Sequence, residues 1–143
     1  MRTRNSLLFL TGLIMAKVVF PLDQVACKSM GYENRNQVDI GPLIVSKVVG
    51  TVKDFQGWPV PKACIGVFDE TGKRLVAVTR TNGRGQFGIG GLREGDYRLV
   101  IKYPGLCPAN AKLKVSRQGS VRRSVKVRLI VGGLDVCSAV DLE

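Results

Sequence analysis

The chain has 143 residues, which predicts one domain of ordinary size with a real hydrophobic core rather than two domains. With 45% hydrophobic and 23% charged residues, it has the composition of a globular protein and not that of a disordered one. The net charge of +11 favours acidic partners such as anionic polysaccharide, envelope phosphate groups or nucleic acid, and the absence of histidine excludes an imidazole base.

Residues 1–26 have the order of a secretory signal. A basic start is followed by an apolar run from Leu7 to Ala16, then by Lys17 and a second short apolar patch. A membrane anchor is the alternative, but the run is interrupted at Lys17 and falls short of the roughly 20 apolar residues that a span needs. We therefore expect export, cleavage of the signal, no transmembrane span after processing, and a secreted, periplasmic or cell-envelope location.

Four cysteines follow the signal segment: Cys27, Cys64, Cys107 and Cys137. An even number in an exported chain favours disulfides, and four cysteines allow three pairings. The chain contains no C-x-x-C sequence, and the wide spacings fit no zinc template. We therefore expect two disulfides and no metal.

The rest of the chain reads as short strands in succession. Residues 27–45 form a polar, turn-rich lead-in. Alternation of apolar and polar residues then predicts strands at 46–54, 63–68, 73–81, 85–89, 96–103, 111–116 and 124–131. Turns rich in glycine, proline and asparagine separate them. Residues 132–143 form an irregular tail that Cys137 is expected to staple to the body, so the sequence predicts an all-β sandwich of seven strands.

Gly83, Gly85 and Gly88 have the spacing of a dinucleotide-binding fingerprint. Such a site needs a helix that begins at the third glycine and points its N-terminus at the pyrophosphate. The next seven residues contain three more glycines, each of which costs about 1 kcal/mol inside a helix. We therefore predict no nucleotide and no cofactor, and a turn in which Asn82 and Gly83 supply positive φ angles between two strands.

A series of glycine, proline, threonine and aromatic positions runs through residues 46–131. They are Gly50, Val52, Asp54, Gly57, Pro59, Pro61, Ala63, Thr81, Gly85, Phe87, Leu92, Gly95, Tyr97 and Leu99. In this order they resemble the carboxypeptidase regulatory-like domain family. The resemblance implies a seven-stranded, immunoglobulin-like sandwich of the prealbumin (transthyretin-like) type, and it says much less about function because such sandwiches host many roles.

The resemblance also carries implications for the cysteines and for catalysis. It places the strand of Cys64 antiparallel to the strand that ends near Ile101, which implies disulfides between Cys64 and Cys107 and between Cys27 and Cys137. It brings in the transthyretin-like hydrolases as an alternative function, but their chemistry resembles a histidine-dependent one and this chain has no histidine. We therefore expect no enzyme and name no catalytic residue.

Two surface features are candidates for binding. Lys112, Lys114, Arg122, Lys126 and Arg128 point outward from the last two predicted strands and form one basic face if these strands are neighbours. The alternative is a charged exterior that discourages edge aggregation. Trp58, the only tryptophan, is expected either to project from its turn and stack on a sugar or to fold over the adjacent proline.

Together these observations predict an exported, non-catalytic binding or structural module at the cell envelope. Its expected partner is an unidentified protein or an anionic glycan. The alternatives are a basic-face binder of anionic polysaccharide or nucleic acid, and the disfavoured hydrolase. Nucleic acid is also disfavoured, because the basic stretch lacks aromatic residues that would stack on bases.

Overall fold

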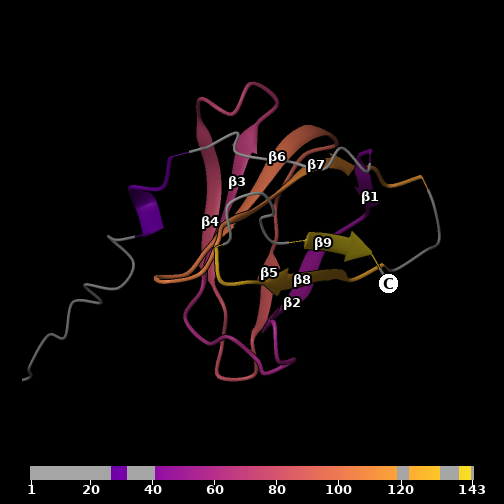
Figure 1. Cartoon of the computed structure of the whole chain (residues 1–143). Helices are drawn as coiled ribbons and strands as arrows, with labels where there is room; N and C mark the ends of the chain where they lie inside the picture. The colour runs from indigo at the N-terminus through magenta and orange to yellow at the C-terminus, as the bar shows by residue number, and fades with distance from the viewer. Residues whose placement is uncertain (1–26, 32–40, 119–122, 133–138, 143) are drawn as a thin grey trace, which may run out of the picture.

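The structure is a computed structural model that describes residues 27–31, 41–118, 123–132 and 139–142, so the predicted signal segment lies outside the described residues. Within these ranges the chain forms nine strands (Figure 1). They are β1 (Leu43–Val45), β2 (Val48–Asp54), β3 (Cys64–Asp69), β4 (Leu75–Arg80), β5 (Gln86–Ile89), β6 (Gly95–Lys102), β7 (Ala109–Val115), β8 (Val125–Leu129) and β9 (Ala139–Leu142). No helix of the described part is long and apolar enough to cross a membrane.

The strands form two sheets that face each other. One sheet has five strands in the order β1–β7–β6–β3–β4, and the other has four in the order β5–β2–β8–β9. Strand β1 runs parallel to β7 and β2 runs parallel to β8, whereas the other pairs are antiparallel. This arrangement confirms the predicted all-β sandwich.

Alternation of side chains along each strand fills the space between the sheets. In β7 and β8 every second residue is buried and the residues between them are half-buried or exposed. The largest of the fully buried side chains include Ile65, Leu99, Leu113 and Leu129, and all belong to one core cluster. The period of two that predicted these strands is therefore the period that builds the core.

Two strands were not predicted. Strand β1 lies within the predicted lead-in, and β9 lies within the tail that was expected to be irregular. They have three and four residues, which leaves little alternation to recognise in the sequence. Each is a strand because of its partner: Leu43 and Val45 pair with Leu113 and Val115 of β7, and their side chains are buried.

The turn between β4 and β5 shows what the glycine series does. The positive φ falls at Gly85 (71°) and at neither Asn82 nor Gly83, which corrects the predicted turn. A side chain at Gly85 would press on the backbone of β2, whose Val52 N–H donates to Gly85 O at 2.7 Å. Asn82 closes the turn with its side-chain oxygen Oδ1, which accepts the N–H groups of Arg84 and Gln86 at 2.9 and 3.0 Å. These contacts fix the turn by which the chain passes from the five-stranded to the four-stranded sheet, so Gly85 serves the fold.

The disulfides differ from the expected pairs. Cys27 is bonded to Cys64, so the pairs Cys64–Cys107 and Cys27–Cys137 are wrong. Cys64 lies on the outer face of the five-stranded sheet, where the segment that begins at Cys27 passes. The N–H of Cys107 instead donates to Ile130 O at 2.8 Å, which holds Cys107 beside the end of β8. Cys107 is also disulfide-bonded, and Cys137 lies outside the described residues.

The lead-in residues 27–31 are part of the packing. They form a short helical turn beside β4 (Figure 1). Cys27, Phe68 and Val100 are buried but stand apart from the main core cluster. A side chain at Gly66 would come within 3.2 Å of Met30, so Met30 occupies the space that this glycine leaves. A second, smaller apolar cluster thus lies on the outer face of the five-stranded sheet.

Candidate functional site: a cation-lined cavity

The last two predicted strands, β7 and β8, lie in different sheets, so the condition for a single basic face is not met. The predicted inward and outward alternation holds, but Lys112 and Lys114 lie on the outer face of the five-stranded sheet, and Lys126 and Arg128 lie on the outer face of the other. Arg122 lies outside the described residues. The cations that the sequence grouped together are therefore divided between opposite sides of the molecule.

Trp58 projects from its turn with 67% of its surface exposed, and Phe55 beside it is 51% exposed. The turn is held by Asp54, whose Oδ1 accepts the N–H groups of Gln56 and Trp58, both at 2.9 Å. Exposure of this tryptophan agrees with the projecting alternative. A sugar-binding role for it remains a prediction.

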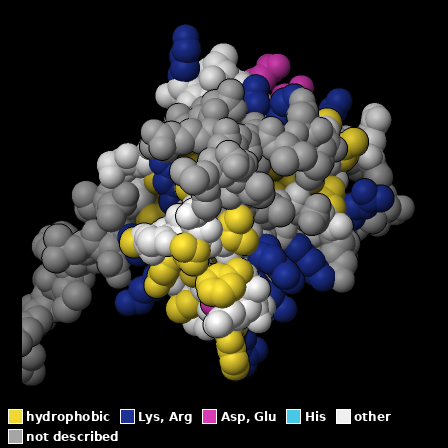
Figure 2. Space-filling model, viewed as in Figure 1, with side chains coloured by type: hydrophobic (Ala, Val, Ile, Leu, Met, Phe, Trp, Pro, Cys, Tyr) yellow, Lys and Arg dark blue, Asp and Glu magenta, His cyan; other side chains and the backbone are white. Residues whose placement is uncertain are grey.

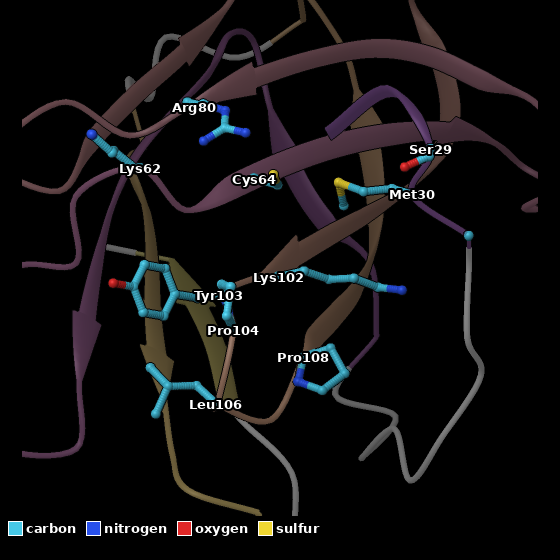
Figure 3. A pocket seen from close by; sticks show the side chains of 11 residues that line it. Ser29, Met30, Lys62, Cys64, Arg80, Lys102, Tyr103, Pro104, Leu106 and Pro108 are labelled. Atoms are coloured by element: carbon cyan, nitrogen blue, oxygen red, sulfur yellow. The ribbon is translucent and has the colours of Figure 1, made fainter. Parts of the chain in front are cut away.

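The structure brings other side chains together at a cavity of about 480 Å³ on the outer side of the five-stranded sheet (Figure 3). Its walls come from the lead-in, from the ends of β3, β4 and β6, and from the loop between β6 and β7. The described lining residues are Ser29, Met30, Gly31, Lys62, Cys64, Arg80, Lys102, Tyr103, Pro104, Leu106 and Pro108. Three of them are cationic and none is acidic.

Strand register explains why Arg80 and Lys102 line the same cavity. Cys64, at the start of β3, is paired with Arg80 of β4 on one side and with Lys102 of β6 on the other. Directly paired residues project to the same face with their Cβ atoms about 5 Å apart. Arg80 and Lys102 therefore flank Cys64 on the outer face, and Figure 3 shows the Arg80 guanidinium pointing into the space between them.

Lys62 reaches the cavity from an unusual backbone conformation. Its φ is 60°, and it is the one residue other than glycine with a positive φ in the described part of the chain. The buried Thr81 holds this segment in place: its hydroxyl donates to Val60 O at 2.6 Å and accepts the N–H of Ala63 at 2.8 Å. The N–H of Lys62 donates to Thr81 O at 3.0 Å. The fold thus fixes Lys62 at the cavity in a conformation that costs free energy.

The remaining lining side chains are largely apolar. Tyr103 and Leu106 are half-buried and pack against the main core, which gives this wall a rigid base. Pro104 and Pro108 restrict the loop that carries them, and Figure 3 places Met30 on the opposite side. The cavity therefore combines an apolar lining with three positive charges, an arrangement suited to an anion that has an apolar portion.

The described part of the site offers no catalytic or metal-binding set. The chain has no histidine, and no carboxylate lines the cavity among the described residues. No group of three or more described histidine, cysteine, aspartate or glutamate residues is placed to hold a metal ion. The arrangement can bind and orient a ligand, and it contains no recognisable general base beside a nucleophile.

Sequence reasoning missed Lys62, Arg80 and Lys102. Each lies beside or at the end of a predicted strand, where a charged residue is ordinary. Only the pairing of β3 with both β4 and β6 makes them neighbours. A signal for Lys102 was present, because the expected antiparallel pairing of the Cys64 strand already placed the end of β6 opposite Cys64.

Comparison with known proteins addresses the family. Residues 47–129 match the carboxypeptidase regulatory-like domain. Among solved structures the chain is similar to sea bream transthyretin in complex with thyroxine, with 14% sequence identity, a TM-score of 0.48, and coverage of 67% of this chain and 93% of that chain. A search of curated proteins finds no match.

The family match spans more than half of the chain and runs from the start of β2 to the end of β8. The chain therefore belongs to the carboxypeptidase regulatory-like domain family, as its glycine, proline and aromatic positions predicted.

Proposed function

We propose that the protein is an exported, non-catalytic binding module that holds an anionic ligand with an apolar portion in the cation-lined cavity. The observation that carries this proposal is that Lys62, Arg80 and Lys102 line one cavity and that no acidic residue is among its described lining. Membership in a regulatory-like domain family supports a role in binding rather than in chemistry.

The geometry favours a small or extended anion over a flat charged surface. Arg80 and Lys102 are half-buried, so their charges are less screened by water than those of fully exposed cations. The Arg80 guanidinium suits a carboxylate, sulfate or phosphate, because arginine donates two parallel hydrogen bonds to such groups. The apolar wall formed by Tyr103, Leu106 and the prolines would cover the rest of the ligand.

A basic face for polysaccharide or nucleic acid loses its main support, because β7 and β8 are not neighbours. An extended polyanion would meet Lys112 and Lys114 on one side of the molecule and Lys126 and Arg128 on the other. A polyanion supplies the anionic group of the ligand only where one end or one residue of it enters the cavity.

The test compares two probes that differ in charge, naphthalene-2-sulfonate and naphthalene-2-sulfonamide. We expect the sulfonate to bind more tightly and to shift the backbone NMR signals of Arg80, Lys102 and Tyr103. Arg80→Gln and Lys102→Gln should each weaken its binding about tenfold, since a hydrogen bond to a charged group contributes about 1.5–3 kcal/mol.

Lys114→Gln is the matched control, because Lys114 is exposed on the same face of the same sheet and does not line the cavity. Thermal unfolding of each variant shows whether the fold is intact. Equal binding of the two probes, or equal loss in Lys114→Gln and Lys102→Gln, would rule out an anion site in this cavity.

A further inference from the structure

A different surface lies at the end of the sandwich that carries the turn between β2 and β3. Strands β2 and β8 run parallel with Asp54 opposite Leu129, so the residues that follow them leave the sheet from the same end. These include Phe55 and Trp58, which are among the large apolar side chains that are most exposed, at 51% and 67%. Figure 2 shows apolar side chains projecting at the lower end of the molecule. We call Phe55 and Trp58 the apolar tip.

The tip is rigid rather than a loose loop. Asp54 accepts two backbone N–H groups of the turn through one carboxylate oxygen, and Gly57 N–H donates to Asp54 O at 3.0 Å. Gly57 has a φ of 88°, which allows the tight reversal that pushes Trp58 outward. The N–H of Asp54 donates to Trp58 O at 2.8 Å, so the base of the turn is closed on β2. The backbone that carries these side chains therefore needs no ordering when they bind.

Charge is distributed unevenly along the sandwich. Three exposed cations stand behind the tip: Lys53 at the end of β2, Arg128 paired with it on β8, and Arg84 in the adjacent β4–β5 turn. The acidic side chains Asp69, Glu70, Glu94 and Asp96 lie in or beside the turns at the opposite end, and Figure 2 shows acidic groups gathered at the top of the molecule. A hydrogen bond from the Thr71 hydroxyl lowers the pKa of Asp69, which therefore stays ionised. The apolar tip thus points away from these negative charges.

We infer that the apolar tip docks onto an anionic lipid surface, with Trp58 and Phe55 in the interfacial layer and Lys53, Arg84 and Arg128 over the lipid headgroups. Aromatic side chains favour this layer, and each lysine or arginine near an anionic membrane adds an attraction that salt screens. The carboxylate in the turn of the tip, Asp54, already accepts backbone N–H groups. A projecting apolar surface of this kind suits a lipid interface better than a sugar, which needs a flat ring and polar partners. This surface is separate from the cavity, so either assignment can fail alone.

Trp58 is the only tryptophan of the chain, so its fluorescence reports on the tip alone. We expect phosphatidylglycerol vesicles at low salt to shift its emission to the blue and brominated phosphatidylglycerol to quench it. Phosphatidylcholine vesicles, or 0.5 M salt, should reduce the bound fraction at least fivefold. Binding through the apolar run of residues 1–26 would carry the full-length chain into the vesicle fraction without moving the Trp58 emission, and that result would overturn the inference.

Variants separate the contributions of the apolar and charged groups. Phe55→Ser should lower partitioning into phosphatidylglycerol vesicles about fivefold, whereas Val76→Ser, on the edge strand β4, should leave it unchanged. Arg84→Gln should weaken binding about threefold at low salt, whereas Lys73→Gln, at the opposite end, should have no effect. Equal effects of the tip variants and their controls would show attraction by net charge only. A change in Trp58 emission with neutral oligosaccharides and none with vesicles would identify a sugar site instead.

Discussion

Thr81 connects the family pattern of the sequence with the position of Lys62 at the cavity. It is one of the positions through which the chain resembles its family, and its buried hydroxyl joins the carbonyl of Val60 to the N–H of Ala63. Between these two residues lies Lys62, whose positive φ would relax if the segment were free. A hydroxyl that serves the fold therefore also determines where one cation of the cavity stands.

Substitution of Lys62 tests this connection. At a φ of 60° glycine avoids a steric cost of roughly 1–2 kcal/mol that any other residue meets. Part of this gain in stability is offset, because glycine has a larger conformational entropy in the unfolded chain. We expect Lys62→Gly to be more stable than Lys62→Ala by about 1 kcal/mol in urea unfolding. Both variants should weaken naphthalene-2-sulfonate binding equally, because both lack the amine. Equal stability of the two variants would show that the conformation carries no strain.

The position of each strand could be predicted from the sequence more readily than the strands with which it pairs. Alternation of apolar residues located β2 to β8, since each buries one face. Pairing depends on surfaces that no single strand displays, and β7 and β8 follow each other in the chain yet belong to different sheets. For the same reason the row of Arg80, Cys64 and Lys102 was not foreseen: its members come from three strands, and none of them is unusual alone.

Gly50 shows a close approach within the four-stranded sheet. It faces the core between β5 and β8, where it pairs with Phe87 and with Val125. A Cβ at this position would lie 2.8 Å from the Phe87 ring and would overlap the backbone oxygen of Val125. The Phe87 ring covers the space above Gly50. Both residues belong to the family pattern, and both therefore have a role in packing.

Replacement of Gly50 by alanine should destabilise the protein by about 3 kcal/mol, since a strand backbone must move to accommodate the methyl group. Gly88→Ala is the matched control in β5, because its Cβ would have an ordinary contact of 3.7 Å with Val49. We expect that variant to change the free energy of unfolding by less than about 0.5 kcal/mol. Chemical denaturation measures both. A loss of similar size at the two positions would contradict the proposed overlap.

At the scale of the molecule, the Cys27–Cys64 bond joins the lead-in to the sandwich. The two cysteines are 37 residues apart, so the bond restricts a substantial loop of the unfolded chain. It also holds the lead-in over the outer face of the five-stranded sheet, where Met30 covers Gly66 and forms part of one wall of the cavity. The pairing could not be read from the cysteine count, because four cysteines allow three pairings and the count favours none of them.

Removal of this bond in the double variant Cys27→Ser and Cys64→Ser should lower the free energy of unfolding by about 3–4 kcal/mol, the loop-entropy contribution expected at this separation. It should also weaken naphthalene-2-sulfonate binding, since the lead-in wall is released.

Peptide mapping of the unmodified protein, without reduction, should recover Cys27 linked to Cys64. The two remaining cysteines, Cys107 and Cys137, should be recovered linked to each other. Recovery of Cys64 linked to Cys107 would contradict the structure.

The parallel pairing of β2 with β8 has a consequence for the time at which the protein acquires its structure. Strand β2 is the first long strand of the chain, yet one of its neighbours ends at Leu129. A chain that emerges with its N-terminus first cannot complete the four-stranded sheet until most of its length is available. Contacts between such distant segments slow folding, because a long loop must close before any contact forms. The four-stranded sheet therefore forms only after most of the chain has been synthesised, although its first long strand is among the earliest segments made.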